Sequence, residues 1–154
     1  MNVEMVNPFL VSLMNVLSTM AQVEAIMNKP TLKQGDRATG DVTGFIGLTS
    51  TNIKGSLAIT FTESAIIQIA SQMLGEVFEI IDESVIDAVG EITNMVSGGA
   101  KKILSEKGYK FNMAIPSVIS GKDHIITHNT KGAIVLVPFE TQAGSLFVEV
   151  CFEG

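Results

Sequence analysis

The two halves of this chain repeat the same succession of patterns, and this repetition limits the possible architectures more than any other feature. Gly-Phe-Ile-Gly-Leu at 44–48 is echoed by Gly-Ala-Ile-Val-Leu at 132–136, and Gly-Ser-Leu at 55–57 recurs at 144–146. Each half has a long helical pattern followed by three strand-like runs, with a short helix expected at 65–74 between them. The sequence therefore predicts an α+β fold of duplicated α-β-β-β halves around an antiparallel sheet.

Hydrophobic periodicity and turn residues predict the individual elements. In the first helix Asn7 is the expected N-cap and Pro8 the first helical residue, and the Lys29-Pro30 dipeptide is expected to close it. A second long helix is expected over residues 83–107. Strands are expected at 31–38, 40–49, 53–61, 111–120, 132–139 and 144–152, with a short one near 124–127. No linker or low-complexity segment divides residues 1–154, so we expect a single domain.

The apolar first helix must be distinguished from a membrane span and a signal peptide, since residues 5–23 carry no charge. A signal peptide needs a basic N-terminal region, but the first basic residue is Lys29. Polar side chains recur every three to four positions along one side of the helix: Ser12, Asn15, Ser18, Thr19 and Gln22. This spacing predicts an amphipathic helix that packs on a core, and no contact with a membrane.

Composition narrows the class of protein further. The chain is 46% hydrophobic and only 17% charged, which is the composition of a folded domain. Its formal net charge of −6 argues against nucleic acid as a partner. The single cysteine, Cys151, has no partner for an internal disulfide and indicates a reducing, cytoplasmic location.

The helix predicted over residues 83–107 has one apolar face and one polar face. The polar face carries Asp87, Glu91, Asn94, Gly98 and Ser105. A solvated outer face is the ordinary interpretation. However, Asn94 and the Gly98-Gly99 pair together lower helix stability by about 2 to 3 kcal/mol, so another requirement must retain them. Either a partner approaches the Glu91–Asn94 pair closely, or the glycines let another element pack beneath the helix.

One spacing on this face resembles a known signature. Asp87-x3-Glu91-x2-Asn94-x21-Pro116 resembles the [Asp/Ser]-x3-Glu-x2-Asn-x21-Pro signature of the CheC/CheX/FliY phosphatases of bacterial chemotaxis. With each residue type used at about one in twenty, chance produces the full pattern about 0.002 times in a chain of this length. The single copy, the chain length and Asn-Pro-Phe at 7–9 favour the CheX branch.

A second, shorter match occurs at Glu4-x2-Asn7. Because Asn7 precedes Pro8 and is expected to cap the first helix, Glu4 is expected to lie outside any helical face. We therefore do not count this pair as a site.

The first long helix can also be aligned with the second as its repeat equivalent. This alignment places Asn15 opposite Asn94 and Ser12 opposite Glu91. The first half then lacks the carboxylate, and one site per chain is expected.

The resemblance implies a protein phosphatase that hydrolyses the aspartyl phosphate of a CheY-type response regulator. An acyl phosphate is already activated, so the catalyst chiefly needs to hold a water in line with phosphorus. Asn94 is expected to position this water, because a carboxamide accepts and donates hydrogen bonds. Glu91 is expected to contact a lysine of the partner, with a general-base role as the lesser alternative. Asp87 and Gly98 are expected at the partner-binding face, and Pro116 has no assigned role.

The resemblance places Mg²⁺ on the regulator and no cofactor in this chain. His124 and His128 are four residues apart in a turn-rich stretch without further ligands, so no metal site is expected. Proteins of the CheX branch are dimeric, and sheet edges invite pairing, so a homodimer is expected. The alternative function is a noncatalytic docking module that binds a regulator in a signalling or flagellar switch assembly.

Overall fold

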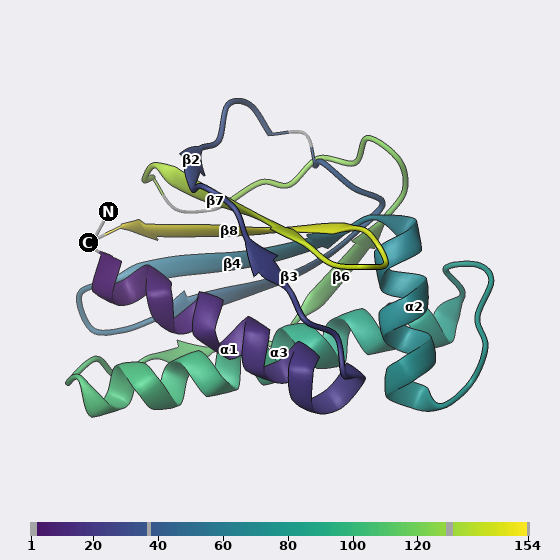
Figure 1. Cartoon of the computed structure of the whole chain (residues 1–154). Coiled ribbons are helices and arrows are strands. Elements are labelled where there is room, and N and C mark those ends of the chain that lie inside the picture. Colours follow the sequence, from purple (N-terminus) through teal and green to yellow (C-terminus); the bar gives the residue numbers. More distant parts are fainter. Residues whose placement is uncertain (1–2, 37, 129–130, 154) are drawn as a thin grey trace.

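The computed structural model describes residues 3–36, 38–128 and 131–153, in which three helices cover one face of an eight-stranded antiparallel sheet (Figure 1). The elements in chain order are α1 (Val3–Ala21), β1 (Ile26–Met27), β2 (Thr31–Leu32), β3 (Val42–Thr49), β4 (Lys54–Phe61), α2 (Glu63–Leu74), α3 (Glu83–Glu106), β5 (Asn112–Met113), β6 (Ser117–Ser120), β7 (Ile134–Glu140) and β8 (Ser145–Glu153). The predicted α+β class is confirmed.

The sheet joins the two halves by exchange of short strands. Its order is β1-β7-β8-β4-β3-β5, with β2 also on β7 and β6 also on β3. The short strands that follow α1 therefore pair with a long strand of the second half, and those that follow α3 pair with a long strand of the first half. The strands β4 and β8 meet along the centre. Each half thus contains two short and two long strands after its long helix, where three strands were expected.

Two of the expected strands are much shorter in the structure. Only Thr31–Leu32 of residues 31–38 forms a strand, because the chain then leaves the sheet edge. The run at 111–120 is divided into β5 and β6 by residues 114–116, where Pro116 has no N–H to donate to the ladder. No strand of the described residues spans 124–127.

The expected bounds of α1 are wrong at both ends. The helix is already formed at Val3, and Pro8 lies inside it. This proline lies in the second turn, and it is tolerated because its missing N–H removes a single hydrogen bond near the start of the helix. At the other end Gln22 adopts a φ of 54°, and the helix stops at Ala21, well before the Lys29-Pro30 dipeptide.

The main core lies between the sheet and the helix layer. Its largest fully buried side chains come from all three helices and from the long strands: Phe9, Leu13, Leu17, Ile46, Leu57, Ile59, Phe61, Ile66, Ile69, Ile92, Leu104 and Phe139. The helices α1 and α3 run antiparallel across this face (Figure 1). Within the described residues no helix combines the length and the apolar character that a membrane crossing needs.

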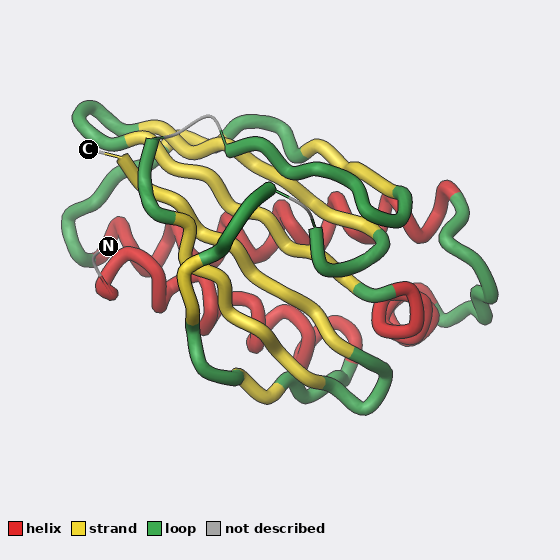
Figure 2. The backbone as a smooth tube through the Cα atoms, turned by 90° about the horizontal axis from the view of Figure 1, so that it is seen from above, coloured by secondary structure: helices red, strands yellow, loops and turns green. Residues whose placement is uncertain are grey.

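Loop segments cross the opposite face of the sheet (Figure 2). Residues 33–36 and 121–128 pair with each other through Ile126 N, which donates to Asp36 O at 2.8 Å. Beneath them a small apolar cluster is formed by Ala38, Ala58 and Ile126. The central strand β4 is therefore covered on both faces, and all its residues after Lys54 are buried.

A buried charged group fixes these loops to the sheet. Glu149 on β8 is fully buried, and its Oε1 accepts from Lys33 Nζ at 2.9 Å and lies 3.0 Å from His128 Nε2. The other ring nitrogen of His128 lies 2.5 Å from Ser56 Oγ on β4. We call Lys33, Ser56, His128 and Glu149 the far-face network. It accounts for His128 as a structural residue.

Candidate functional site

The helix α3 presents the predicted face because both its start and its packing are strongly specified. Asp82 caps the helix, accepting from Val85 N through its side chain at 3.0 Å. Apolar residues on one side are buried against the sheet and α1, in the order Val85, Ala88, Val89, Ile92, Val96, Ala100 and Leu104. The helix is thereby fixed about its own axis, and Asp87, Glu91 and Asn94 are exposed on its other side.

Glu91 and Asn94 lie at a shallow hollow on this face. Its remaining lining comes from the helix itself and from the segment between β5 and β6: Gly90, Ala114, Ile115 and Pro116. Pro116 follows Asn94 by 22 positions in the sequence, yet the fold brings both residues to the same hollow. The long spacing of the signature therefore corresponds to two segments that meet in the folded protein.

Strand β3 holds the segment between β5 and β6 in place. Ala114 N donates to Gly47 O at 3.0 Å, and Ser117 pairs with Phe45 in the sheet. On the helix side, a Cβ at Gly44 would overlap the Thr93 hydroxyl, so only glycine permits the observed approach of α3 to β3. Strand β3 therefore positions both walls of the hollow, which are α3 and the segment between β5 and β6.

The two adjacent glycines of α3 have different roles. A Cβ at Gly99 would overlap the hydroxyl of Ser12 on α1, which donates to Val96 O at 2.8 Å. Gly99 therefore permits close packing of the two helices. A Cβ at Gly98 would meet nothing within 4 Å. Packing thus explains one glycine and leaves Gly98 on the accessible face, one turn beyond Asn94.

Asp87 lies on the same face but does not line the hollow. It is exposed one helical turn before Glu91. From Asp87 to Gly98 the face extends about 16 Å along the helix axis. The structure thus brings Glu91, Asn94 and Pro116 together, with Asp87 at one end of the face and Gly98 at the other.

Sequence reasoning missed Ile115, which lines the hollow and is 89% exposed. The available signal was its position before Pro116, since a residue before proline is biased to an extended conformation and is often held in a turn. Nothing in the sequence indicated which way its side chain points.

The burial patterns of α1 and α3 correct the expected alignment of the two helices. Ser12 of α1 lies against Gly99 of α3, and aligning these two residues makes the burial patterns of the two helices agree. With this alignment the exposed positions coincide, Glu4 with Glu91, Asn7 with Asn94 and Ser18 with Ser105. The expected equivalence of Asn15 with Asn94 is wrong, because Asn15 lies eight positions further along α1 than Asn7.

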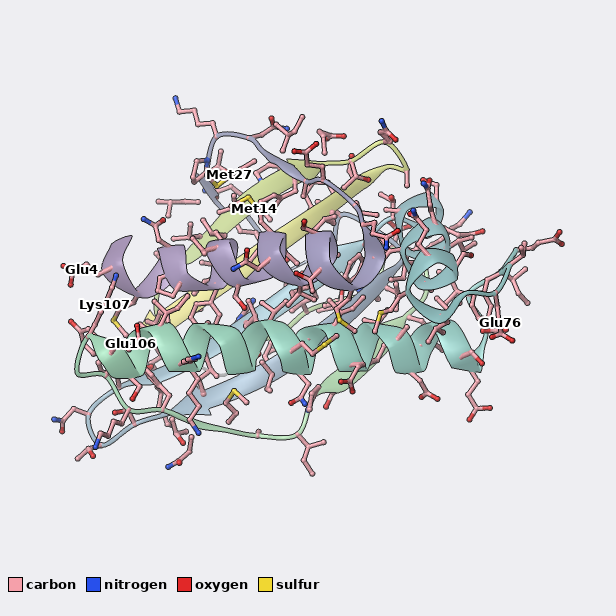
Figure 3. All side chains as sticks on the ribbon, turned by 60° about the horizontal axis from the view of Figure 1, so that its bottom comes forward. Glu4, Met14, Met27, Glu76, Glu106 and Lys107 are labelled. Carbon is pink, nitrogen blue, oxygen red and sulfur yellow. The ribbon has the colours of Figure 1, made fainter. Side chains whose placement is uncertain are left out.

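The expectation that Glu4 lies outside the helix is also wrong. Glu4 and Asn7 are both exposed residues of α1, three positions apart. Figure 3 shows Glu4 at the first turn of α1, at the same end of the helix layer as Lys107. The first half therefore carries its own Glu-x2-Asn pair at the repeat position of the second. The expectation that each chain has a single functional site remains a prediction.

The two histidines of the turn-rich stretch, His124 and His128, contact other protein groups. His124 Nε2 lies 2.6 Å from Thr43 Oγ1, and His128 belongs to the far-face network. In the part of the chain that the structure describes, no three His, Cys, Asp or Glu residues are grouped so that they could hold a metal ion.

This duplicated antiparallel sheet with long helices on one face is also the fold of a CheC-like superfamily protein from Shewanella sp. PV-4, which is 54% identical, with a TM-score of 0.94 over 100% of both chains. The sequence profile of the chemotaxis phosphatase CheX matches residues 42–140, and the chain belongs to this family. The CheY-P phosphatase CheX of Thermotoga maritima is 27% identical over 99% of this chain and 94% of its own length.

Solved structures agree with this assignment. The chemotaxis protein CheX from Vibrio vulnificus is 52% identical, with a TM-score of 0.92 over 98% of this chain and 100% of that one. The CheX-CheY-BeF3-Mg²⁺ complex from Borrelia burgdorferi has a chain that is 26% identical, with a TM-score of 0.83 over 99% of this chain and 100% of that one.

Proposed function

We propose that this chain is a phosphatase that hydrolyses the aspartyl phosphate of a phosphorylated CheY-type response regulator in chemotaxis. The observation that carries the proposal is the hollow in which Pro116, in the segment between β5 and β6, meets Glu91 and Asn94 of α3. Membership of the chemotaxis phosphatase family supports it, as do the CheY-P phosphatase activity in the name of the Thermotoga relative and the CheY bound in the Borrelia complex.

Asn94 positions the attacking water. The reaction needs no covalent nucleophile, because the acyl phosphate is already activated and only requires a water in line with its leaving group. The carboxamide oxygen of Asn94 accepts a hydrogen bond from this water, while its NH2 group donates to a phosphoryl or partner oxygen. A helix fixed by its buried face holds the side chain with little freedom, which favours such positioning.

Glu91 docks the regulator next to the reacting group. Its exposed carboxylate forms a charge-assisted contact with a partner lysine, which sets the helix in register over the phosphoryl group. Asp87 extends the acidic part of this face, and the absence of a side chain at Gly98 allows a close approach of the partner one turn beyond Asn94. A general base is not required for an activated acyl phosphate.

We assign Mg²⁺ to the regulator rather than to this chain. The described residues contain no candidate metal site, and the Borrelia complex contains Mg²⁺ together with CheY and BeF3. Oxygen ligands of the kind that Mg²⁺ prefers are supplied by carboxylates and phosphoryl oxygens. We also propose a cytoplasmic location for the protein.

The test follows the decay of a phosphorylated CheY-type regulator from the same cell, with and without this protein. Catalytic amounts of the chain are expected to accelerate phosphate release severalfold or more, with multiple turnovers per chain. The measurement is release of inorganic phosphate at fixed regulator concentration. Unchanged decay for every candidate regulator would contradict the phosphatase proposal.

The alternative is a docking module that binds the regulator without hydrolysing its phosphate. The same exposed face would serve this function, so the two proposals differ in turnover and not in binding. Binding without acceleration would favour the docking module. The Asn94 carboxamide favours catalysis, since a purely docking face has no requirement for a water-positioning group.

We expect the protein to form a homodimer. Supporting this, β1 and β5 end the sheet with edges that have no further strand among the described residues, and such edges favour pairing with a second copy. Light scattering on a sizing column is expected to give twice the chain mass of 16.4 kDa. A mass of one chain at all concentrations would contradict the dimer.

A further inference from the structure

We propose that Ile115 is the apolar anchor by which the phosphorylated regulator docks next to Glu91 and Asn94. This inference rests on the proposed function, because it concerns the partner of the same site. It adds a specificity residue that lies outside the Asp-Glu-Asn-Pro signature.

Ile115 is placed as an anchor residue requires. Its side chain is 89% exposed, and it lines the same hollow as the acid–amide pair. The segment is tied to β3 before and after this residue, since Ala114 N donates to Gly47 O at 3.0 Å and Ser117 pairs with Phe45. Because the backbone is already held, a partner that covers this side chain does not have to order the loop, which makes burial of the side chain more effective in binding.

The repeat shows that the fold does not require an apolar residue here. Asn28 N donates to Pro138 O at 2.8 Å in the first half, as Ala114 N donates to Gly47 O at 3.0 Å in the second. Gly47 and Pro138 each stand two residues before the end of their strand. The connections between β1 and β2 and between β5 and β6 are therefore equivalent.

At this equivalent position the two halves differ in chemistry. Pro30 in the first half corresponds to Pro116 in the second, so the proline serves the shape of the connection in both. The preceding residue is Lys29 in the first half and Ile115 in the second, and both are exposed. Because a lysine occupies the equivalent backbone position, the fold itself does not require isoleucine there. The isoleucine beside Glu91 and Asn94 is explained by contact with a partner.

An apolar contact also supplies binding affinity, to which the acid–amide pair contributes little. An exposed ion pair between Glu91 and a partner lysine contributes little to affinity in water. Burial of an isoleucine side chain contributes about ten- to hundredfold in affinity, and it excludes water from neighbouring polar contacts. The occupant is therefore a surface of the regulator with an apolar patch beside the phosphorylated aspartate.

The test separates binding from turnover with the substitution Ile115→Lys, which installs the side chain type found at the equivalent position. We expect the KM for phosphorylated regulator, and the Kd for regulator loaded with beryllofluoride and Mg²⁺, to rise about tenfold or more, with kcat at saturation retained. Ile115→Ser is expected to give the same direction without an added charge. Ile125→Lys is the matched control, because Ile125 is 57% exposed on the loops of the opposite face.

The outcomes distinguish this inference from the proposed function. An active wild-type chain whose KM and Kd do not change in either Ile115 variant would overturn the anchor and leave the phosphatase proposal intact. A wild-type chain without turnover that binds loaded regulator through Ile115 would support the anchor and overturn the phosphatase proposal. A fall in kcat with an unchanged Kd would also overturn the anchor.

Discussion

Asn94→Ala is expected to abolish acceleration of acyl-phosphate decay, with kcat reduced by about two to three orders of magnitude. The reason is that alanine can neither accept from the attacking water nor donate to a phosphoryl oxygen. The Kd for beryllofluoride-loaded regulator is expected to change less than about threefold, because Glu91 and Ile115 remain. Stability is expected to be unchanged or higher by a few tenths of a kcal/mol, since alanine is the better helix former at an exposed position.

The repeat supplies a control for this experiment within the same chain. Asn7→Ala removes the equivalent carboxamide of α1, and it is expected to leave turnover unchanged if each chain has one functional site. Substantial residual turnover in Asn94→Ala that disappears in the double variant would instead show that Glu4 and Asn7 form a second site. A large fall in melting temperature for Asn94→Ala would mean that Asn94 is structural, and would contradict its catalytic assignment.

Lys33→Met is expected to lower the free energy of unfolding by about 3 to 5 kcal/mol. Glu149 is fully buried, its Oε1 accepts from Lys33, and its Oε2 has no hydrogen-bond partner among the described residues. Methionine fills a similar volume but removes one of the two groups that compensate the carboxylate. Urea denaturation monitored by circular dichroism measures the effect.

Two further variants test whether the buried charge causes this loss. Lys33→Met combined with Glu149→Leu is expected to recover much of the stability, because no uncompensated charge then remains in the interior. Lys54→Met at an exposed position of β4 is expected to change the free energy of unfolding by less than about 1 kcal/mol. A loss below about 1 kcal/mol for Lys33→Met would contradict the importance of the far-face network.

The element order and the exposed face of α3 could be predicted from the sequence because both depend on local periodicity. An apolar stripe at helical spacing fixes which side of α3 is buried, so the exposure of Glu91 and Asn94 follows directly. The signature also paired these residues with Pro116, although their meeting in one hollow depends on β3. Contacts between residues far apart in the sequence produce no periodic pattern from which they could be predicted.

The errors have physical causes as well. Asn7-Pro8 is a common helix start, and only the structure shows that tertiary packing of α1 extends the helix back to Val3. This extension brings Glu4 onto a helical face. The far-face network escaped prediction because Lys33, His128 and Glu149 come from distant segments, and a glutamate in an apolar strand shows no sign of its partners.

The exchange of short strands between the halves makes each half depend on the other. A chain made of one half alone would leave its short strands without the long strand they pair with, and β4 without β8. Two copies of such a half, each lending its short strands to the other, would restore every pairing of the present sheet. The architecture is thus that of two intertwined copies of one unit joined in a single chain, in which neither half has a complete sheet without the other.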